Sequence, residues 1–359
     1  PETGSWIHSQ LASLKSYRAV ALTQEARNLD QYPVDALFTA ESLVGWKGAA
    51  NRVVRRITGQ YPFYPEVLRA YRADLIHAHH GFQGGRCLRA RRCSALPMVT
   101  SFYGADATRA AGNPKWRALY RRLFSEGELF LAEGSSMAAQ LGRIGCPEEK
   151  IAVHRLGVDL PRIPFHRPAA VERTRILICA SFREKKGIPD GIRAVARARE
   201  RTGADVGLVL IGDGPERPAV EGALAETGIG EFTERLGVLP YSRVLEELGR
   251  CHILLQPSRT ASDGDGEGGA PVILLEGQAA GMPVVATRHA DIPEYVVDEA
   301  SGLLAGEGDV EGLADRLAAL LVDPSSWPAM GRSGRAHVET NYNASRQTQA
   351  LEAIYDSLT

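Results

Sequence analysis

Short apolar runs rich in Val, Ile and Leu alternate with helix-length amphipathic segments along almost the whole chain of 359 residues. Parallel strands need a long crossover between them, usually a helix, and the helices then cover both faces of the sheet. The alternation therefore predicts an α/β fold built from doubly wound, Rossmann-like domains. Strands are expected near residues 18–23, 35–39, 74–79, 97–102, 129–134, 150–156, 175–181, 206–212, 232–237, 252–258, 283–288 and 302–306.

The chain is about twice as long as a typical domain, so we expect two domains. Pro161, Pro164 and Pro168 interrupt the periodicity over 158–174, which is the composition of a linker. The opening residues resemble a loop, which predicts that the first domain lacks its first strand. The expected parts are an N-terminal domain over 1–165, a C-terminal domain over 166–340, and a helix over 341–359 that crosses back to the N-terminal domain.

Composition argues against several classes of protein. No apolar run reaches the roughly 18 residues that a membrane span requires. The five cysteines are an odd number and contain no C-x-x-C pair, which argues against a disulfide framework and favours the cytoplasm.

Charge is distributed unevenly along the chain. Residues 1–165 carry 22 Lys and Arg against 14 Asp and Glu, whereas residues 166–359 carry 20 against 29. Basic residues recur in the first half on helix-like segments at 51–56, 86–92 and 114–122. Two interpretations stand: solvated helix faces, or a surface that contacts an anionic acceptor or the anionic lipid of the inner membrane face. Nucleic acid is not expected as a partner.

A basic loop follows the strand expected at 175–181. Arg183, Lys185 and Lys186 precede Gly187 and an amphipathic helix. Cations oppose the dipole at a helix N-terminus, so their placement there favours a bound anion such as a diphosphate. A solvated basic loop is the alternative.

A second loop contains Gly212 and Gly214 directly after a strand. The dinucleotide pattern G-x-G-x-x-G fails at Arg217, so the loop is a weak cofactor signal. Its glycines predict either close approach of the backbone to a bound nucleotide or sugar, or a plain turn.

The third loop, DGDGEGGAPVILLEGQAAG over 263–281, leads glycines into a helix. Gly268 and Gly269 are expected to allow φ > 0, and Pro271 suits the first helical turn, so unpaired N–H groups would face the cleft between the domains. Glu276 is expected near the second turn. Its carboxylate could accept hydrogen bonds from the vicinal hydroxyls of a ribose, or it could be a solvated helix residue.

Polar residues also follow two strands of the first half. His77 and His79 share one face of a strand and His80 points to the other, so pocket-lining or core histidines are favoured over a metal site. Tyr103 and Asp106 follow the next strand. Asp106 either serves a ligand or caps the helix that follows it.

Four motifs in order, EKKG, GDGP, EGGAP-x4-E and DIPE, resemble the retaining glycosyltransferases of the GT-B fold, specifically the family-four group. The resemblance covers essentially the whole chain and is closest to exopolysaccharide transferases of the colanic-acid type. It implies two Rossmann-like domains that face a central cleft, with a nucleotide-sugar as co-substrate and neither cofactor nor metal.

The resemblance also implies roles for individual residues. Arg183 and Lys186 would neutralise the donor diphosphate, and Lys185 matches less well. Tyr103 and Asp106 are grouped with them as catalytic, and His79 and His80 are placed on the acceptor side. The donor-binding set is Glu276, Glu267, Gly268, Gly269, Ala270, Pro271, Gly212, Gly4 and Ser5.

Three positions depart from the family pattern. Glu267 and Glu276 have eight residues between them where the family usually has seven, which shifts the first carboxylate. Ser181 stands where the family arginine usually lies, so its role is assigned to Arg183. Tyr103 replaces the histidine that lines the sugar site in many relatives.

The resulting hypothesis is transfer of a sugar, favoured as a UDP-sugar, to a hydroxyl with retention of configuration. The acceptor would be a saccharide, a lipid-linked saccharide or a small molecule. Alternatives are a natural-product glycosyltransferase, a nucleotide-sugar epimerase or hydrolase, and a non-catalytic nucleotide-sugar-binding protein.

Overall fold

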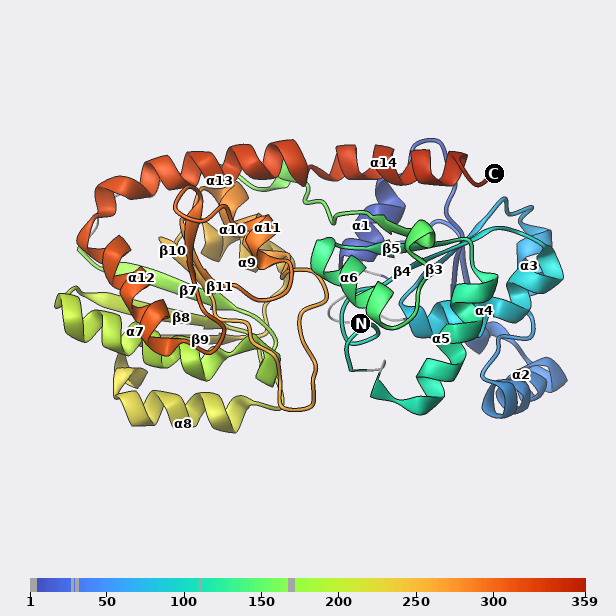
Figure 1. The fold of residues 1–359 in the computed structure, drawn as a ribbon, viewed down its shortest axis with the longest axis horizontal. Helices are drawn as coiled ribbons and strands as arrows, with labels where there is room; N and C mark the ends of the chain where they lie inside the picture. The colour runs from blue at the N-terminus through green and yellow to red at the C-terminus, as the bar shows by residue number, and fades with distance from the viewer. Residues whose placement is uncertain (1–4, 27–28, 30–31, 110–111, 167–171) are drawn as a thin grey trace. The chain divides into compact units, whose positions relative to one another are not determined.

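The computed structural model describes residues 5–26, 29, 32–109, 112–166 and 172–359. Its contacts divide the chain into two compact units. The first unit runs to Gly157 and includes Ala344–Thr359, and the second unit is Val158–Asn343. Figure 1 shows helices and strands alternating in both. Within the described residues, no helix is both long and apolar enough to cross a membrane.

Six parallel strands form the sheet of the second unit, in the order β12-β11-β10-β7-β8-β9. The chain enters at the central strand β7, winds outward to β9, and returns to place β10 beside β7. This is the doubly wound order of a Rossmann fold, and its switch point lies between β7 and β10. The strands are β7 (Thr174–Cys179), β8 (Val206–Ile211), β9 (Thr233–Gly237), β10 (Ile253–Gln256), β11 (Val284–Thr287) and β12 (Gly302–Ala305).

Apolar side chains bury both faces of this sheet. Along β7, Ile176 and Ile178 belong to one apolar cluster, whereas Leu177 between them belongs to another. Because side chains alternate along a strand, a sheet covered on both sides needs continuous apolar runs such as this one. The covering helices are α7 (Ile188–Thr202), α8 (Arg217–Thr227), α9 (Tyr241–Leu248), α10 (Ile273–Ala280), α11 (Ile292–Tyr295), α12 (Val310–Val322) and α13 (Trp327–Asn341).

The first unit contains two separate parallel sheets. One has the order β3-β4-β5-β6, and the other pairs β1 with β2. All twelve expected strands are therefore present, but those near 18–23 and 35–39 do not join the main sheet. Both are three residues long and only half-buried, so they bury little apolar surface. The strands are β1 (Ala21–Thr23), β2 (Leu37–Thr39), β3 (Ile76–His79), β4 (Met98–Ser101), β5 (Leu129–Ala132) and β6 (Ile151–Val153).

The last helix, α14 (Ala344–Asp356), packs within the first unit. Its Leu351 and Tyr355 lie in one apolar cluster with side chains of β4 and β5. The carboxylate of Glu352 accepts hydrogen bonds from the backbone N–H groups of Lys15 and Ser16, both at 2.6 Å. The other helices of this unit are α1 (Ser5–Ser13), α2 (Gly45–Thr58), α3 (Tyr64–Ala70), α4 (Gly81–Ser94), α5 (Pro114–Glu126) and α6 (Ser135–Arg143).

Candidate functional site

Two loops meet at the switch point of the second unit. The loop after β7 contacts the loop after β10 through a hydrogen bond from the Arg259 N–H to the Lys185 carbonyl at 2.9 Å. Gly187 has φ 59°, and a Cβ there would lie 1.9 Å from the carbonyl oxygen of Pro257. Only glycine fits both the backbone conformation and the contact, so the two loops are held backbone against backbone.

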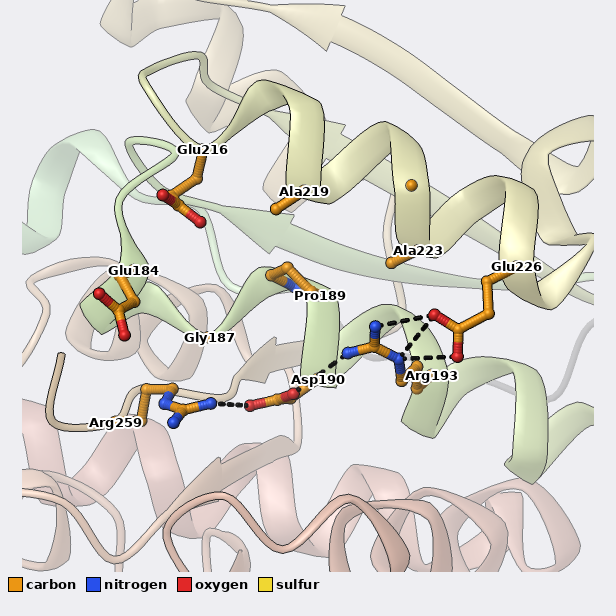
Figure 2. A pocket seen from close by; sticks show the side chains of 11 residues that line it. Glu184, Gly187, Pro189, Asp190, Arg193, Glu216, Ala219, Ala223, Glu226 and Arg259 are labelled. Atoms are coloured by element: carbon orange, nitrogen blue, oxygen red, sulfur yellow. Dashed lines mark hydrogen bonds and ion pairs between the residues drawn. The ribbon is translucent and has the colours of Figure 1, made fainter. Parts of the chain in front are cut away.

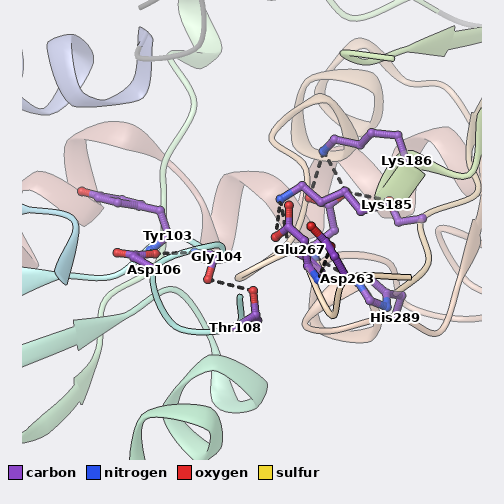
Figure 3. A network of polar contacts seen from close by, with 12 residues as sticks. Tyr103, Gly104, Asp106, Thr108, Lys185, Lys186, Asp263, Glu267 and His289 are labelled. Atoms are coloured by element: carbon purple, nitrogen blue, oxygen red, sulfur yellow. Dashed lines mark hydrogen bonds and ion pairs between the residues drawn. The ribbon is translucent and has the colours of Figure 1, made fainter. Parts of the chain in front are cut away.

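Lys186 and Glu267 form a partly buried ion pair where these loops meet (Figure 3). The lysine Nζ lies 2.7 and 2.8 Å from the two carboxylate oxygens, and the Ser258 hydroxyl donates to the same carboxylate at 2.8 Å. Burial acts to raise the pKa of Glu267, but the charges of Lys186 and Lys185 and the hydrogen bonds outweigh it and lower that pKa. Glu267 is therefore a carboxylate that holds Lys186 in one place.

The other two cations of the basic loop differ from Lys186. Lys185 Nζ donates to the Gly266 carbonyl at 3.0 Å and lies 3.3 Å from Asp265 (Figure 3). The Arg183 side chain is exposed and makes no hydrogen bond or ion pair to another described residue. The structure thus brings Lys186 together with Glu267 but leaves Arg183 apart from them.

The glycine loop differs from the expectation in two respects. Neither Gly268 nor Gly269 has φ > 0; the glycines of this stretch with positive φ are Gly264, at 79°, and Gly281, at 92°. Helix α10 begins at Ile273 rather than at Pro271, because the Pro271 carbonyl first accepts a three-residue turn bond from the Leu274 N–H at 3.0 Å. Both expectations were wrong in detail.

Backbone donors of this loop are nevertheless available. Gly268, Gly269 and Ala270 are buried, and their N–H groups have no hydrogen-bond acceptor among the residues that the structure describes. Buried N–H groups normally find an acceptor, so three such donors in sequence favour an anionic or polar ligand.

Glu276 lies in the first turn of α10, one turn earlier than expected. It is 8% exposed, so it is a buried residue and not a solvated one. Burial raises the pKa of Glu276 to about 7, and a hydrogen bond from Tyr241 acts in the opposite direction. In the described part of the second unit no cation pairs with this carboxylate. It can therefore accept hydrogen bonds from a ligand.

Gly212 follows β8 with φ 127°. A Cβ at this position would lie 1.9 Å from the carbonyl oxygen of Ala180, the residue after β7. The chain therefore requires glycine here to bring two loops of the same edge together, whether or not a ligand also approaches.

In the first unit, the buried carboxylate of Asp106 lies beside Tyr103 and Gly104 of its own loop (Figure 3) and also bonds to Gly81 of an earlier loop. It accepts hydrogen bonds from the N–H groups of Tyr103 at 3.1 Å, Gly104 at 3.0 Å and Gly81 at 2.8 Å. Gly81 is the first residue of α4, whereas Asn113 caps the following helix, α5. The expectation that Asp106 caps the following helix was therefore wrong: it caps an earlier one.

The histidines of β3, His77 and His79, and His80 directly after it have protein partners. His79 Nδ1 lies 2.6 Å from the Tyr103 hydroxyl, and His77 stacks on His79 with ring centroids 4.3 Å apart, as expected for one strand face. Burial lowers the pKa of His79 to about 3, with smaller effects from His80 and His154, so its imidazole is neutral. His80 Nδ1 lies 3.6 Å from Asp106.

Two predicted donor residues lie at the start of the chain. Gly4 falls outside the described residues, and Ser5 is the first residue of α1.

A separate cavity of about 460 Å³ lies between η5 (Glu184–Lys186), α7 and α8 (Figure 2). Its lining includes none of Lys186, Glu267 and Glu276. Arg193 Nη2 donates a hydrogen bond across the cavity to Glu226 Oε2 at 2.8 Å. The cavity is thus distinct from the cluster at the sheet edge.

Sequence reasoning missed two members of that cluster. Ser258 follows β10 and His289 follows β11, and the latter accepts the Glu267 N–H at 3.0 Å. The rule that parallel strands end at a common edge could have identified both.

Two family models match the chain. "Glycosyltransferase Family 4" matches residues 15–162, and "Glycosyl transferases group 1" matches residues 161–337. The amylovoran biosynthesis glycosyltransferase of Erwinia amylovora is 33% identical over 293 residues, which cover 81% of this chain and 72% of that protein. The putative colanic acid biosynthesis glycosyltransferase of Escherichia coli K12 is 32% identical over 313 residues, covering 86% and 75%.

Among solved structures, Anabaena HepE in complex with UDP and glucose matches with a TM-score of 0.80 at 16% identity. The match covers 100% of this chain and 97% of that one. This likeness confirms the expected fold class of two Rossmann-like parts.

Proposed function

The chain belongs to the glycosyltransferases, since the family-four and group-one models match its two halves. We propose that it transfers a sugar from a nucleotide-diphosphate donor to a hydroxyl acceptor with retention of the anomeric configuration. The relatives named for amylovoran and colanic acid biosynthesis support a role in exopolysaccharide assembly. The UDP in the HepE complex supports a UDP-sugar donor.

The observation that carries this proposal is the cluster at the switch point. Lys186 is held by Glu267 beside three N–H groups, at Gly268, Gly269 and Ala270, that have no acceptor in the described part of the chain. As the anomeric C–O bond breaks, negative charge grows on the departing diphosphate. A fixed cation and preorganised N–H donors stabilise that charge, and this requires neither cofactor nor metal.

Glu276 would hold the ribose. Its buried carboxylate has unused acceptor capacity, and two vicinal hydroxyls are a donor pair of the right kind. Hydrogen bonds from those hydroxyls would favour the ionised carboxylate, so donor binding would lower the pKa of Glu276.

The first experiment screens UDP- and GDP-sugars for thermal stabilisation of the protein, followed by turnover with saccharide acceptors. We expect Lys186→Ala to lower turnover about 100-fold or more, in the range seen when one charge-stabilising donor is removed. Arg332→Ala in α13, which also removes an exposed cation, is the control and should retain full activity.

Other outcomes would identify other functions. Donor consumption without any acceptor would indicate an epimerase or hydrolase, and donor binding without turnover would indicate a binding protein. Wild-type turnover in Lys186→Ala would overturn the diphosphate role.

Helix α2 supports a second proposal, contact with an anionic membrane at its cytoplasmic face. Trp46, Val53 and Ile57 are 76%, 56% and 78% exposed, and their spacing of seven and four residues places them on one helix face. Exposed basic residues flank that face at Lys47, Arg52 and Arg56, whereas Arg55 lies on the opposite side of the helix and donates to Gln24 at 2.9 Å. An apolar face with Trp between cations is typical of helices that lie in a bilayer interface.

The other basic helices of the first unit differ from α2. Arg91 and Arg92 of α4 pair with Glu128 and Glu126, whereas no ion pair of an α2 cation appears among the described residues. Lys47, Arg52 and Arg56 therefore remain available for lipid phosphates, each contributing about 1 kcal/mol near an anionic surface. An enzyme held at the membrane surface in this way would be close to a lipid-linked acceptor.

Vesicle sedimentation tests the membrane proposal. The double variant Trp46→Ser with Ile57→Ser should bind phosphatidylglycerol vesicles at least tenfold more weakly than wild type. Val322→Ser, which changes a residue 73% exposed in the second unit, is the control and should bind normally. Equal binding by both variants, or equal binding of wild type to phosphatidylcholine, would contradict it.

A further inference from the structure

His289 occupies a buried position between two loops of the second unit. It is 6% exposed and follows β11. Its Nε2 accepts the backbone N–H of Glu267 at 3.0 Å, and its Nδ1 lies 2.8 Å from a carboxylate oxygen of Glu307. The other oxygen of Glu307 accepts the backbone N–H of Thr260 at 2.6 Å.

These contacts determine the tautomer of His289. A backbone N–H can only donate, so Nε2 must be unprotonated and the proton must reside on Nδ1, which donates to Glu307. Burial acts to raise the pKa of Glu307, but the hydrogen bonds from Thr260 and His289 outweigh it and keep that pKa low. Glu307 is thus an ionised acceptor suited to orient the ring.

The loop after β10 is therefore fastened at two points. Thr260 is attached to Glu307 directly, and Glu267 is attached to it through His289. Between these points, a Cβ on Gly266 would lie 3.3 Å from the imidazole, so the loop also packs closely on the ring. The backbone of Glu267 is held by His289 while its carboxylate holds Lys186.

We propose that His289, in its Nδ1-protonated form, is a positioning residue for the donor site: it fixes the Glu267 backbone and thereby sets where Lys186 meets the diphosphate. This inference rests on the proposed function of Lys186. His289 contacts the Glu267 backbone and not Lys186, so it acts on the lysine through Glu267.

Two substitutions separate the two nitrogens of the ring. His289→Gln places an amide oxygen near the position of Nε2 and can still accept the Glu267 N–H. His289→Asn places its amide near Nδ1, so it keeps the bond to Glu307 and loses the acceptor for Glu267. His337→Asn is the control, since among the described residues the His337 ring contacts the Glu294 carbonyl, Asn341 and Tyr342, which lie in another part of the unit.

The experiment measures amide hydrogen exchange at Glu267 and donor kinetics in each variant. His289→Asn should lose about tenfold in Glu267 amide protection and about tenfold in kcat/KM for the donor, the scale of one lost hydrogen bond. His289→Gln and His337→Asn should stay within about threefold of wild type in both. The imidazole ¹⁵N shifts of the wild-type protein should report the Nδ1–H tautomer.

Several results would overturn the proposal. They are an Nε2–H tautomer in the wild type, unchanged protection and kinetics in His289→Asn, or equal losses in His289→Gln and His289→Asn. A different result would separate the two proposals. If the wild type turns over no nucleotide sugar, but the Glu267 amide loses its exchange protection only in His289→Asn, then the proposed function is wrong and His289 still positions the Glu267 backbone.

Discussion

Replacing Glu276 with Gln should stabilise the second unit at alkaline pH while weakening donor binding. Glu276 is buried and its pKa is raised to about 7 by that burial, against an ordinary value of 4.5. A group with a raised pKa in the folded state binds its proton more tightly there than in the unfolded chain. Its contribution to stability is therefore complete below pH 4.5 and is lost as pH rises through 7.

The size of the effect follows from the two pKa values. Each unit of difference corresponds to 1.36 kcal/mol, so ionisation of Glu276 costs the folded state about 3 kcal/mol above pH 7. Glutamine keeps the shape of the glutamate side chain but has no carboxyl group that can ionise. For a unit of this size we expect Glu276→Gln to raise Tm by roughly 6–12 °C at pH 8 and to change it little at pH 4.5.

Thermal unfolding of wild type and Glu276→Gln at both pH values measures the difference directly. Glu200→Gln, at an exposed position of α7, is the control and should show no pH-dependent difference from wild type. The same samples with saturating donor should show less ligand-induced stabilisation in Glu276→Gln. Equal Tm differences at pH 4.5 and pH 8, or a lower Tm at pH 8, would refute the reasoning.

Three further predictions concern the scaffold. Gly187→Ala should abolish donor turnover and lower the stability of the second unit by more than Gly203→Ala does. Both glycines have φ near 60°, but of the two only Gly187 would place its new Cβ against a carbonyl oxygen, that of Pro257. Equal melting curves for the two variants would contradict this. Asp106→Asn should destabilise the first unit by about 2 kcal/mol, because one amide oxygen cannot replace a carboxylate that accepts three N–H bonds; chemical denaturation measures it. Tyr355→Phe should cost about 1 kcal/mol by removing the 2.6 Å hydrogen bond to His77, and an unchanged midpoint would argue that water replaces it.

Much of the fold was predictable because it rests on local periodicity. The apolar run of β7 could be assigned to a sheet covered on both faces, since alternate residues must both be buried. The position of the basic loop was predictable too, because the apolar run that precedes it marks where the strand ends. By contrast, the separation of β1 and β2 from the main sheet depends on pairing between distant strands, which local periodicity does not encode.

By itself, the sequence determined the α/β class, the twelve strands, and the placement of Lys186 and Glu276 after strands of one sheet. Only the tertiary structure decided which charges are paired. Glu267 appeared displaced by one residue, yet folding brings two distant loops together and places its carboxylate 2.7 Å from Lys186. The pKa of Glu276 was likewise decided by burial, because desolvation depends on every element packed around a group and not on its neighbours along the chain.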